Sequence, residues 1–243
     1  MKELNINNLL SFWRLAGSKA GAYHISSYLE VSTINNSDWP NRIWVTSVQN
    51  DEAFNVASKL IRDIHQQHRF SLFHEEAEKV NERMHAFDLE LISSQTGMNL
   101  SLDHWTLKEI IEPLKMIRVS TPKEAYEWSE LFKVSFGYTI SGETVTSLLH
   151  DVSFFTIYHQ EHHAGTAILY CTGNVAGIHG LGVLPNMRGK GIAKSTMEAL
   201  LNEAKLKGLE FACLQASDAA FNMYKHLGFI QEFKMSNYQI KKQ

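Results

Sequence analysis

The sequence is poor in cysteine and carries little net charge. Only Cys171 and Cys213 occur among 243 residues, which excludes a disulfide framework and a zinc site built from cysteines. Lysine and arginine number 23 against 26 acidic residues, so there is no basic excess of the kind that binds nucleic acid or an anionic membrane. The N-terminus lacks the pattern of a secretory signal peptide, and we therefore expect a cytoplasmic protein.

Charge is missing altogether between His162 and Met187. This stretch is not apolar, because it holds three histidines, two asparagines, two threonines and five glycines. A membrane-spanning helix needs ~20 predominantly apolar residues. The stretch is therefore predicted to form buried strands joined by tight turns.

Glycine and charge are unevenly distributed along the chain. Residues 1–114 contain three glycines, with 10 basic against 15 acidic residues, a net charge of −5. Residues 115–243 contain the other eleven glycines, with 13 basic against 11 acidic residues, a net charge of +2, and the two values sum to −3. We expect an N-terminal α/β domain over 1–114 and a second domain over 115–243, with any anionic ligand bound by the second.

Hydrophobic periodicity and turn residues predict an α/β fold with a mixed sheet flanked by helices. In the second part the predicted order is β-α-α-β-β-β-α-β-α-β. The strands lie at 115–121, 153–160, 164–172, 175–184, 209–217 and 229–240. In the first part we predict helices at 4–16, 51–67 and 76–87, strands at 41–48 and 69–75, and a hairpin or single strand at 88–102. The order from residue 41 repeats the order from residue 175, as an internal duplication would, although no residue-level repeat is visible.

A glycine-bearing loop between a strand and a helix, residues 183–195, is the most informative segment. Unpaired N–H groups and a partial positive charge make a helix N-terminus an anion-binding site. Gly189 and Gly191 allow phosphate oxygens to approach the backbone, and Arg188 and Lys190 add positive charge. The alternative is a turn that uses glycine for its geometry only.

Two common nucleotide-binding motifs do not fit this loop. A Walker A loop needs glycines where Arg188 and Ala193 stand. A Rossmann fingerprint needs a third glycine where Lys194 stands, and three consecutive strands lead into this loop instead of a βαβ unit.

The segment resembles the acetyl-CoA loop of the GNAT superfamily of N-acetyltransferases, whose pattern is Gln/Arg-x-x-Gly-x-Gly/Ala. It reads Asn186-Met187-Arg188-Gly189-Lys190-Gly191, and Asn186 departs from the family's Gln/Arg. The resemblance continues in the preceding strand, 180–185, and in 214–229, which is similar to the family's Tyr-x-x-x-Gly-Phe segment. It covers roughly residues 115–240 and implies a GNAT-type fold there. If the repeated element order makes residues 1–114 a second, degenerate GNAT-like copy, that copy lacks the cofactor loop.

The resemblance also implies roles for particular residues. Leu181, Gly182 and Val183 would pair with the pantetheine arm of acetyl-CoA as an added strand would. The pyrophosphate would be held by Arg188, Gly189, Lys190, Gly191, Ile192 and Ala193. Tyr224 matches the tyrosine that protonates the departing thiolate, with core packing as the alternative role. Ser217 stands where many relatives contact the cofactor.

A base for the acceptor amine is the remaining requirement. His179 lies on the strand that leads into the loop, in phase with Leu181 and Val183, and related arylalkylamine acetyltransferases use histidines of this strand. The alternatives are a histidine satisfied by local hydrogen bonds and a water chain without a dedicated base.

Other candidate residues favour structural interpretations. His159, His162 and His163 crowd a predicted hairpin tip and are interpreted as an exposed turn, so we expect no metal. Cys171 and Cys213 are interpreted as buried structural thiols. Trp39, Trp44 and Trp105 are interpreted as core residues, with a place in an acceptor pocket as the alternative.

The sequence thus predicts transfer of an acetyl group from acetyl-CoA to a primary amine by direct attack in a ternary complex. One acetyl-CoA is expected per chain, because Asp51 and Glu52 open the corresponding helix of the first half and would repel a pyrophosphate. The alternative is a non-catalytic sensor or scaffold that binds CoA. Small amines, antibiotics, peptides and protein N-termini all remain open as acceptors, and no nucleic acid or membrane partner is expected.

Overall fold

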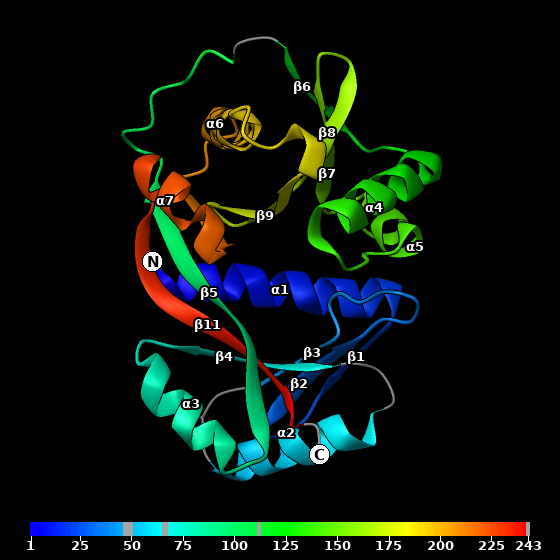
Figure 1. Ribbon diagram of the computed structural model, residues 1–243, viewed down its shortest axis with the longest axis vertical. Helices are drawn as coiled ribbons and strands as arrows, with labels where there is room; N and C mark the ends of the chain where they lie inside the picture. The colour runs from blue at the N-terminus through cyan, green and yellow to red at the C-terminus, as the bar shows by residue number, and fades with distance from the viewer. Residues whose placement is uncertain (46–50, 65–67, 111–112, 242–243) are drawn as a thin grey trace.

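A computed structural model describes residues 1–45, 51–64, 68–110 and 113–241. In these residues, eleven strands form one mixed sheet in the order β1-β2-β3-β4-β11-β5-β10-β9-β8-β7-β6 (Figure 1). The strands are β1 (Ala22–Ile25), β2 (Leu29–Thr33), β3 (Arg42–Val45), β4 (Arg69–His74), β5 (Leu89–Ser101), β6 (Leu114–Arg118), β7 (Ser153–His159), β8 (His162–Thr172), β9 (Val175–Val183), β10 (Phe211–Ala216) and β11 (Ile230–Ile240).

Helices cover both faces of this sheet. They are α1 (Lys2–Ala20), α2 (Asp51–Asp63), α3 (Ala77–His85), α4 (Pro122–Phe136), α5 (Gly142–Leu148), α6 (Ile192–Leu206) and α7 (Asp218–His226), with a short 3-10 turn, Pro185–Met187, before α6. Helix α4 begins with Pro122 in its first turn and a capping box between Thr121 and Glu124. None of the helices in the described ranges is long and apolar enough to cross a membrane.

The predicted elements of residues 115–243 are all present, and the uncharged stretch does form β8 and β9. In the first part, residues 88–102 form the single strand β5 and not a hairpin. Strands β1 and β2 were not predicted, because these two short strands show no strict alternation of polar and apolar side chains. Part of the predicted strand 41–48 and of the predicted helix 51–67 lies outside the described residues.

The two halves of the chain exchange a strand. Strand β11 pairs antiparallel with both β4 and β5, while β5 pairs antiparallel with β10. Each half therefore completes its part of the sheet with the last strand of the other half. At the centre, Gly97 of β5 lies opposite Phe233 of β11, whose ring occupies the space that a side chain at 97 would need.

The same order of elements occurs twice. The run β1-β2-β3-α2-β4-α3-β5 matches β7-β8-β9-α6-β10-α7-β11, and the third strand pairs in parallel with the fourth in each run. Helices α4 and α5 are present only in the second half. This correspondence extends by two strands the repeat that the sequence indicates from residues 41 and 175.

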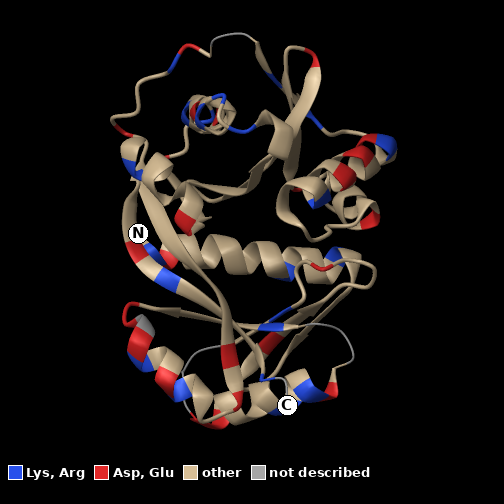
Figure 2. Cartoon of the chain, viewed as in Figure 1, with Lys and Arg blue, Asp and Glu red and all other residues tan. Residues whose placement is uncertain are grey.

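Helix α1 lies across the middle of the molecule, between the two groups of strands (Figure 1). Its residues Phe12 and Trp13 are buried in a core that also contains residues of α4 and β11. Charged residues are concentrated on the other helices at the periphery, whereas most of α1 and of the strands that it faces consists of uncharged residues (Figure 2). Two asparagines of α1, Asn5 and Asn8, are nevertheless fully buried, and both bind the strands beneath them.

Candidate active site

Strands β9 and β10 separate from each other in the middle of the sheet. They pair in parallel only between Val175–Gly177 and Phe211–Cys213. Beyond this point β9 continues to Val183 along β8, and β10 continues to Ala216 along β5. The edge of β9 from residue 178 onwards therefore faces an opening in the sheet, with backbone groups available to a further extended chain.

A β-bulge in β9 changes which side chains face this opening. Between the pairs Gly182–Thr166 and His179–Ile168, three steps along β9 match two along β8, and Gly180 has a φ of +52°. Leu181 and Val183 consequently pack against the core beneath α6. The ring of His179 lies on the other side of the sheet, 5.3 Å between ring centroids from Phe12 of α1. The prediction that His179 shares a face with Leu181 and Val183 is therefore wrong, because the bulge shifts the alternation by one residue.

His179 is held by a residue of the N-terminal helix. Its Nε2 lies 3.1 Å from Oδ1 of Asn8, whose amide nitrogen already donates to the carbonyl of Tyr170 and to Thr172. Nε2 must therefore carry the proton and donate, which leaves the lone pair on Nδ1. Burial lowers the pKa of His179 to about 4, against the opposing effect of a hydrogen bond with Gln215. The imidazole is neutral at neutral pH.

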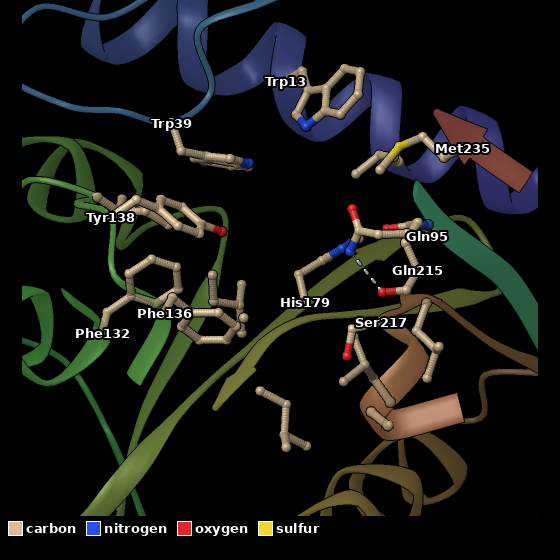
Figure 3. Close-up of a pocket in the computed structure, with 18 of the residues that line it drawn as sticks. Trp13, Trp39, Gln95, Phe132, Phe136, Tyr138, His179, Gln215, Ser217 and Met235 are labelled. Atoms are coloured by element: carbon tan, nitrogen blue, oxygen red, sulfur yellow. Dashed lines mark hydrogen bonds between the residues drawn. The ribbon is translucent and has the colours of Figure 1, made fainter. Parts of the chain in front are cut away.

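A cavity of about 160 Å³ lies beside His179, and both halves of the chain line it (Figure 3). Its second-half lining includes Phe132, Phe136, Tyr138, Gly180, Leu181, Gln215, Ser217 and Tyr224. Its first-half lining consists of Leu9, Trp13, Trp39, Arg42 and Gln95. A cavity of ~150 Å³ holds a ligand the size of benzene, so this space suits a small acceptor group.

Of the three tryptophans singled out in the sequence, one reaches this cavity. Trp39 is buried in the core as predicted, and its ring also forms part of the cavity wall. Trp44 is buried in the core, and Trp105 donates from its indole to Asn202 of α6, so these two have the predicted structural roles.

Tyr224 reaches the cavity from α7. Its side chain is only 7% exposed, and burial raises the pKa of the phenol to about 12. Its hydroxyl makes no hydrogen bond with any residue in the described part of the chain. Tyr224 is thus a protonated donor whose hydrogen is not committed to another group. Ser217 lines the same cavity at the N-cap of α7, without capping that helix through its hydroxyl.

The N-terminus of α6 forms a second hollow, at the end of β9. Gly191 is the N-cap and supplies no side-chain acceptor, so the first N–H groups of this 15-residue helix keep their hydrogens available. Gly189 and Gly191 both have a φ of +77°, and no heavy atom lies within 4 Å of where a Cβ would be on either residue. The hollow is lined by Val183, Met187, Arg188, Gly189, Gly191, Ile192, Ala193, Lys194 and Met223.

The two cationic side chains of this loop, Arg188 and Lys190, have different neighbours. The guanidinium of Arg188 turns back and donates to the carbonyls of Val183 and Ser135, at 3.2 and 3.3 Å, and so braces the end of β9 against α4. Lys190 lies 3.6 Å from the sulfur of Met187. An open helix N-terminus with glycines that leave room and cations nearby has the donor chemistry that a pyrophosphate needs.

The other histidines and the two cysteines singled out in the sequence form no catalytic or metal-binding arrangement in the described part of the chain. The hairpin between β7 and β8 turns at Gln160 and Glu161, and His163 there lies 3.0 Å from the hydroxyl of Tyr158. Within the ranges that the structure describes, no three His, Cys, Asp or Glu side chains gather as metal ligands would. Cys213 is buried as predicted, and burial raises the pKa of its thiol. Cys171 is exposed, which corrects the sequence prediction: it lies near the end of β8, outside the core.

Sequence reasoning missed the contribution of the first half to this site. Asn8, Trp13, Arg42 and Gln95 come from α1, β3 and β5, and no motif connects them. The signal that was available is Asn5 and Asn8, two polar residues on the apolar face of a helix that buries Leu9, Phe12 and Trp13. Buried amides of this kind need specific partners.

Comparisons with known proteins agree with this geometry. Residues 122–229 match the model of the acetyltransferase (GNAT) family, so this part of the chain is similar to a GNAT acetyltransferase domain. A search of curated proteins finds no match.

Solved structures extend the likeness in fold to the whole chain. A GCN5-related N-acetyltransferase from Kribbella flavida is 15% identical with a TM-score of 0.71, over 98% of this chain and 97% of that one. A GCN5-related N-acetyltransferase from Sphaerobacter thermophilus is 14% identical with a TM-score of 0.61, over 87% and 76% of the two chains. A tandem GNAT protein from the clavulanic acid biosynthesis pathway is 12% identical with a TM-score of 0.55, over 97% and 94%. The mixed sheet flanked by helices is thus the GNAT fold that the sequence predicts.

Proposed function

We propose that the protein transfers an acetyl group from acetyl-CoA to a primary amine that enters the cavity beside His179. The observation that carries this proposal is the opening between β9 and β10. It places the free edge of one strand between the cavity, at His179 and Leu181, and the hollow at the N-terminus of α6, at Val183. A long acetyl donor with an anionic end and a reactive end could bind along this edge, with its anionic end in the hollow and its reactive end at the cavity.

The donor would lie along β9. The backbone of Leu181, Gly182 and Val183 would pair with the amide groups of the pantetheine arm. Gly189, Lys190, Gly191, Ile192 and Ala193 would hold the pyrophosphate with their N–H groups, and Lys190 would add charge. The role proposed for Arg188 is narrower: its guanidinium binds the carbonyl of Val183 and so fixes the strand end from which the loop starts. Ser217 would contact the donor from the N-terminus of α7.

Two neutral side chains would move the protons. Bound acetyl-CoA supplies an activated thioester, which an unprotonated amine attacks directly. Nδ1 is the unprotonated nitrogen of the neutral His179 imidazole, and it would take a proton from the nitrogen of the substrate amine. Tyr224 keeps its proton up to high pH and would donate it to the departing sulfur. Direct transfer needs no enzyme nucleophile, in agreement with the burial of Cys213.

The first half would complete the acceptor cavity without binding a second donor. It is proposed to be a degenerate GNAT-like repeat over residues 1–114, joined to residues 115–243 through the exchanged strands. Helix α2, at the position of α6 in the repeat, begins with Asp51 and Glu52, and Asp51 forms an ion pair with Arg83. The loop before it includes residues 46–50, outside the described part of the chain.

A panel of primary amines tests the proposal. CoA release is followed with acetyl-CoA and each amine, and calorimetry measures the binding of acetyl-CoA itself. We expect one acetyl-CoA per chain and amine-dependent release of CoA. Binding without turnover on any amine would favour the alternative, a CoA-binding sensor, and two equivalent sites would contradict the role given to the first half.

A further inference from the structure

One cation in the acceptor cavity has no counter-charge. Arg42 of β3 is only 9% exposed and lines the cavity beside His179 and Tyr224. Among the described residues, its guanidinium makes one hydrogen bond, from a terminal nitrogen to the carbonyl of the preceding residue at 3.2 Å. Its buried Nε has no acceptor among these residues. A buried charge without a partner is costly to the folded protein, and such groups are retained where they have a function.

The acidic residues on the neighbouring segments are engaged elsewhere. Glu30 of β2 accepts two hydrogen bonds from Arg14, at 2.5 and 2.7 Å, and one from Tyr23. Asp38 is exposed and accepts from the backbone of Thr139. No ion pair joins Arg42 to a carboxylate among the described residues, and the cavity lining contains neither Asp nor Glu.

The indole beside Arg42 is a hydrogen-bond donor without an acceptor. The buried indole N–H of Trp13 has no partner in the described part of the chain, and the guanidinium lies 5.7 Å from the centre of that ring. In Figure 3 the indole nitrogens of Trp13 and Trp39 and the hydroxyl of Tyr138 all lie toward the cavity. Guanidinium and indole N–H groups can only donate. The ligand that satisfies them must therefore bring acceptor atoms and negative charge.

We propose that Arg42 and Trp13 bind a carboxylate carried by the acceptor, so that the substrate is a small amino acid or a similar amine with an acidic group. A planar guanidinium and an adjacent N–H match the geometry of a carboxylate. The cavity volume of about 160 Å³ admits a small molecule, and the aromatic walls suit an apolar side chain.

The bound carboxylate would neutralise the charge of Arg42. The pair would therefore orient the acceptor without adding net charge beside the thioester. This inference rests on the proposed acetyl transfer but makes a separate claim about recognition.

Binding of 3-phenylpropionate tests recognition without any need for turnover. Its neutral isostere, 3-phenylpropionamide, is the control ligand, and calorimetry compares the wild type with Arg42→Met, Arg42→Lys and Trp13→Phe. We expect the wild type to bind the carboxylate at least 10-fold more tightly than the amide. Arg42→Met should abolish this preference, whereas Arg42→Lys and Trp13→Phe should reduce it. Arg62→Met, which changes an exposed arginine paired with Asp88, is the matched control and should leave it unchanged.

Stability separates recognition from a structural role. If Arg42 is an unpaired buried charge, Arg42→Met should raise the Tm of the ligand-free protein while it removes carboxylate binding. A lower Tm together with weaker binding would assign Arg42 to the framework of the fold and overturn the inference. Arg42→Lys keeps the charge and serves as the second variant if the methionine variant does not fold.

Turnover then distinguishes the two proposals. Phenylalanine, phenethylamine and the corresponding aminophosphonate are compared as acceptors. A kcat/KM at least 10-fold higher for phenylalanine than for phenethylamine, with the difference lost in Arg42→Met, supports the inference. A higher kcat/KM for the aminophosphonate than for phenylalanine would mean that Arg42 recognises a phosphonate or phosphate and not a carboxylate. Equal turnover of amine and amino acid refutes the inference and leaves acetyl transfer intact. If the carboxylate binds but no acceptor causes release of CoA, the proposed acetyl transfer is refuted and the proposed carboxylate recognition is not.

Discussion

The imidazole of His179 is hydrogen-bonded to the side chain of Asn8, a residue 171 positions earlier in the chain, at 3.1 Å. Asn8 also binds the carbonyl of Tyr170 and the hydroxyl of Thr172 on β8. The contact is close because residue 177 is glycine: a Cβ there would lie 1.8 Å from Oδ1 of Asn8. The first helix therefore sets the tautomer and the orientation of the proposed base.

His179→Gln should lower kcat for acetyl transfer by about 10²–10⁴-fold, the usual contribution of a positioned general base. The pH profile of the wild type should show no acidic limb near 6.5 from this residue, because its pKa is lowered to about 4. Steady-state kinetics between pH 5 and 9 check both statements. An unchanged kcat in His179→Gln would favour a water chain as the base.

The same pKa predicts how stability changes with pH. Between pH 6.5 and about 4 the unfolded state binds a proton at residue 179 that the folded state does not, so stability falls as the pH falls through this range. Since one pKa unit corresponds to about 1.4 kcal/mol, the free energy of unfolding should drop by about 2 kcal/mol at pH 5 relative to pH 7 through this group. Urea unfolding of the wild type and His179→Gln at the two pH values measures it. The drop should be smaller in the variant by that amount.

Tyr224→Phe should lower kcat and leave the affinity for acetyl-CoA nearly unchanged. The hydroxyl has no hydrogen bond to any described residue, so its loss should change the free energy of unfolding by less than about 1 kcal/mol. Turnover kinetics, donor titration and thermal unfolding of the same preparation separate these effects. Full activity in the variant would mean that Tyr224 serves packing only.

Gly191→Ala should weaken acetyl-CoA binding at least 10-fold. The added methyl group would enter the open space at the N-terminus of α6, and a φ of +77° costs an alanine about 1–2 kcal/mol. Gly208→Ala is the matched control, because Gly208 has a φ of +75° and equally open surroundings at the other end of α6. Both variants should lose similar stability, and only Gly191→Ala should lose affinity in calorimetry. Equal affinities in the two variants would contradict a pyrophosphate site at residue 191.

The exchange of β5 and β11 predicts that the two halves unfold together. Gly97→Ala should destabilise the whole protein, by about 1–3 kcal/mol for an overpacked site, because its Cβ would lie 2.2 Å from the ring of Phe233. Calorimetry should show one transition, with calorimetric and van't Hoff enthalpies in agreement. A fragment of residues 1–114 should not fold alone, since it lacks β11. Two separate transitions would contradict this view.

Local rules in the sequence determined much of the second half. Thr121, Pro122 and Glu124 define the start of α4, and Gly137 ends it in a left-handed conformation, because caps depend only on neighbouring residues. The loop from Arg188 to Ala193 could be identified for the same reason. Its glycines and the helix that follows form a complete anion site within one short segment.

Only the tertiary structure decided the rest. The bulge at Gly180, which turns His179 away from Leu181 and Val183, arises from pairing with β8 and does not appear in a pattern of alternation. The acceptor cavity brings Trp13, Arg42 and His179 together from distant parts of the chain. The strand exchange does the same for Gly97 and Phe233. Sequence by itself determined the positions of turns, helix caps and the anion-binding backbone of the loop before α6. These features depend on short-range sterics and hydrogen bonds between neighbouring residues. Which side chains meet across the opening depends on long-range strand pairing, and this pairing is what makes the first half part of the site.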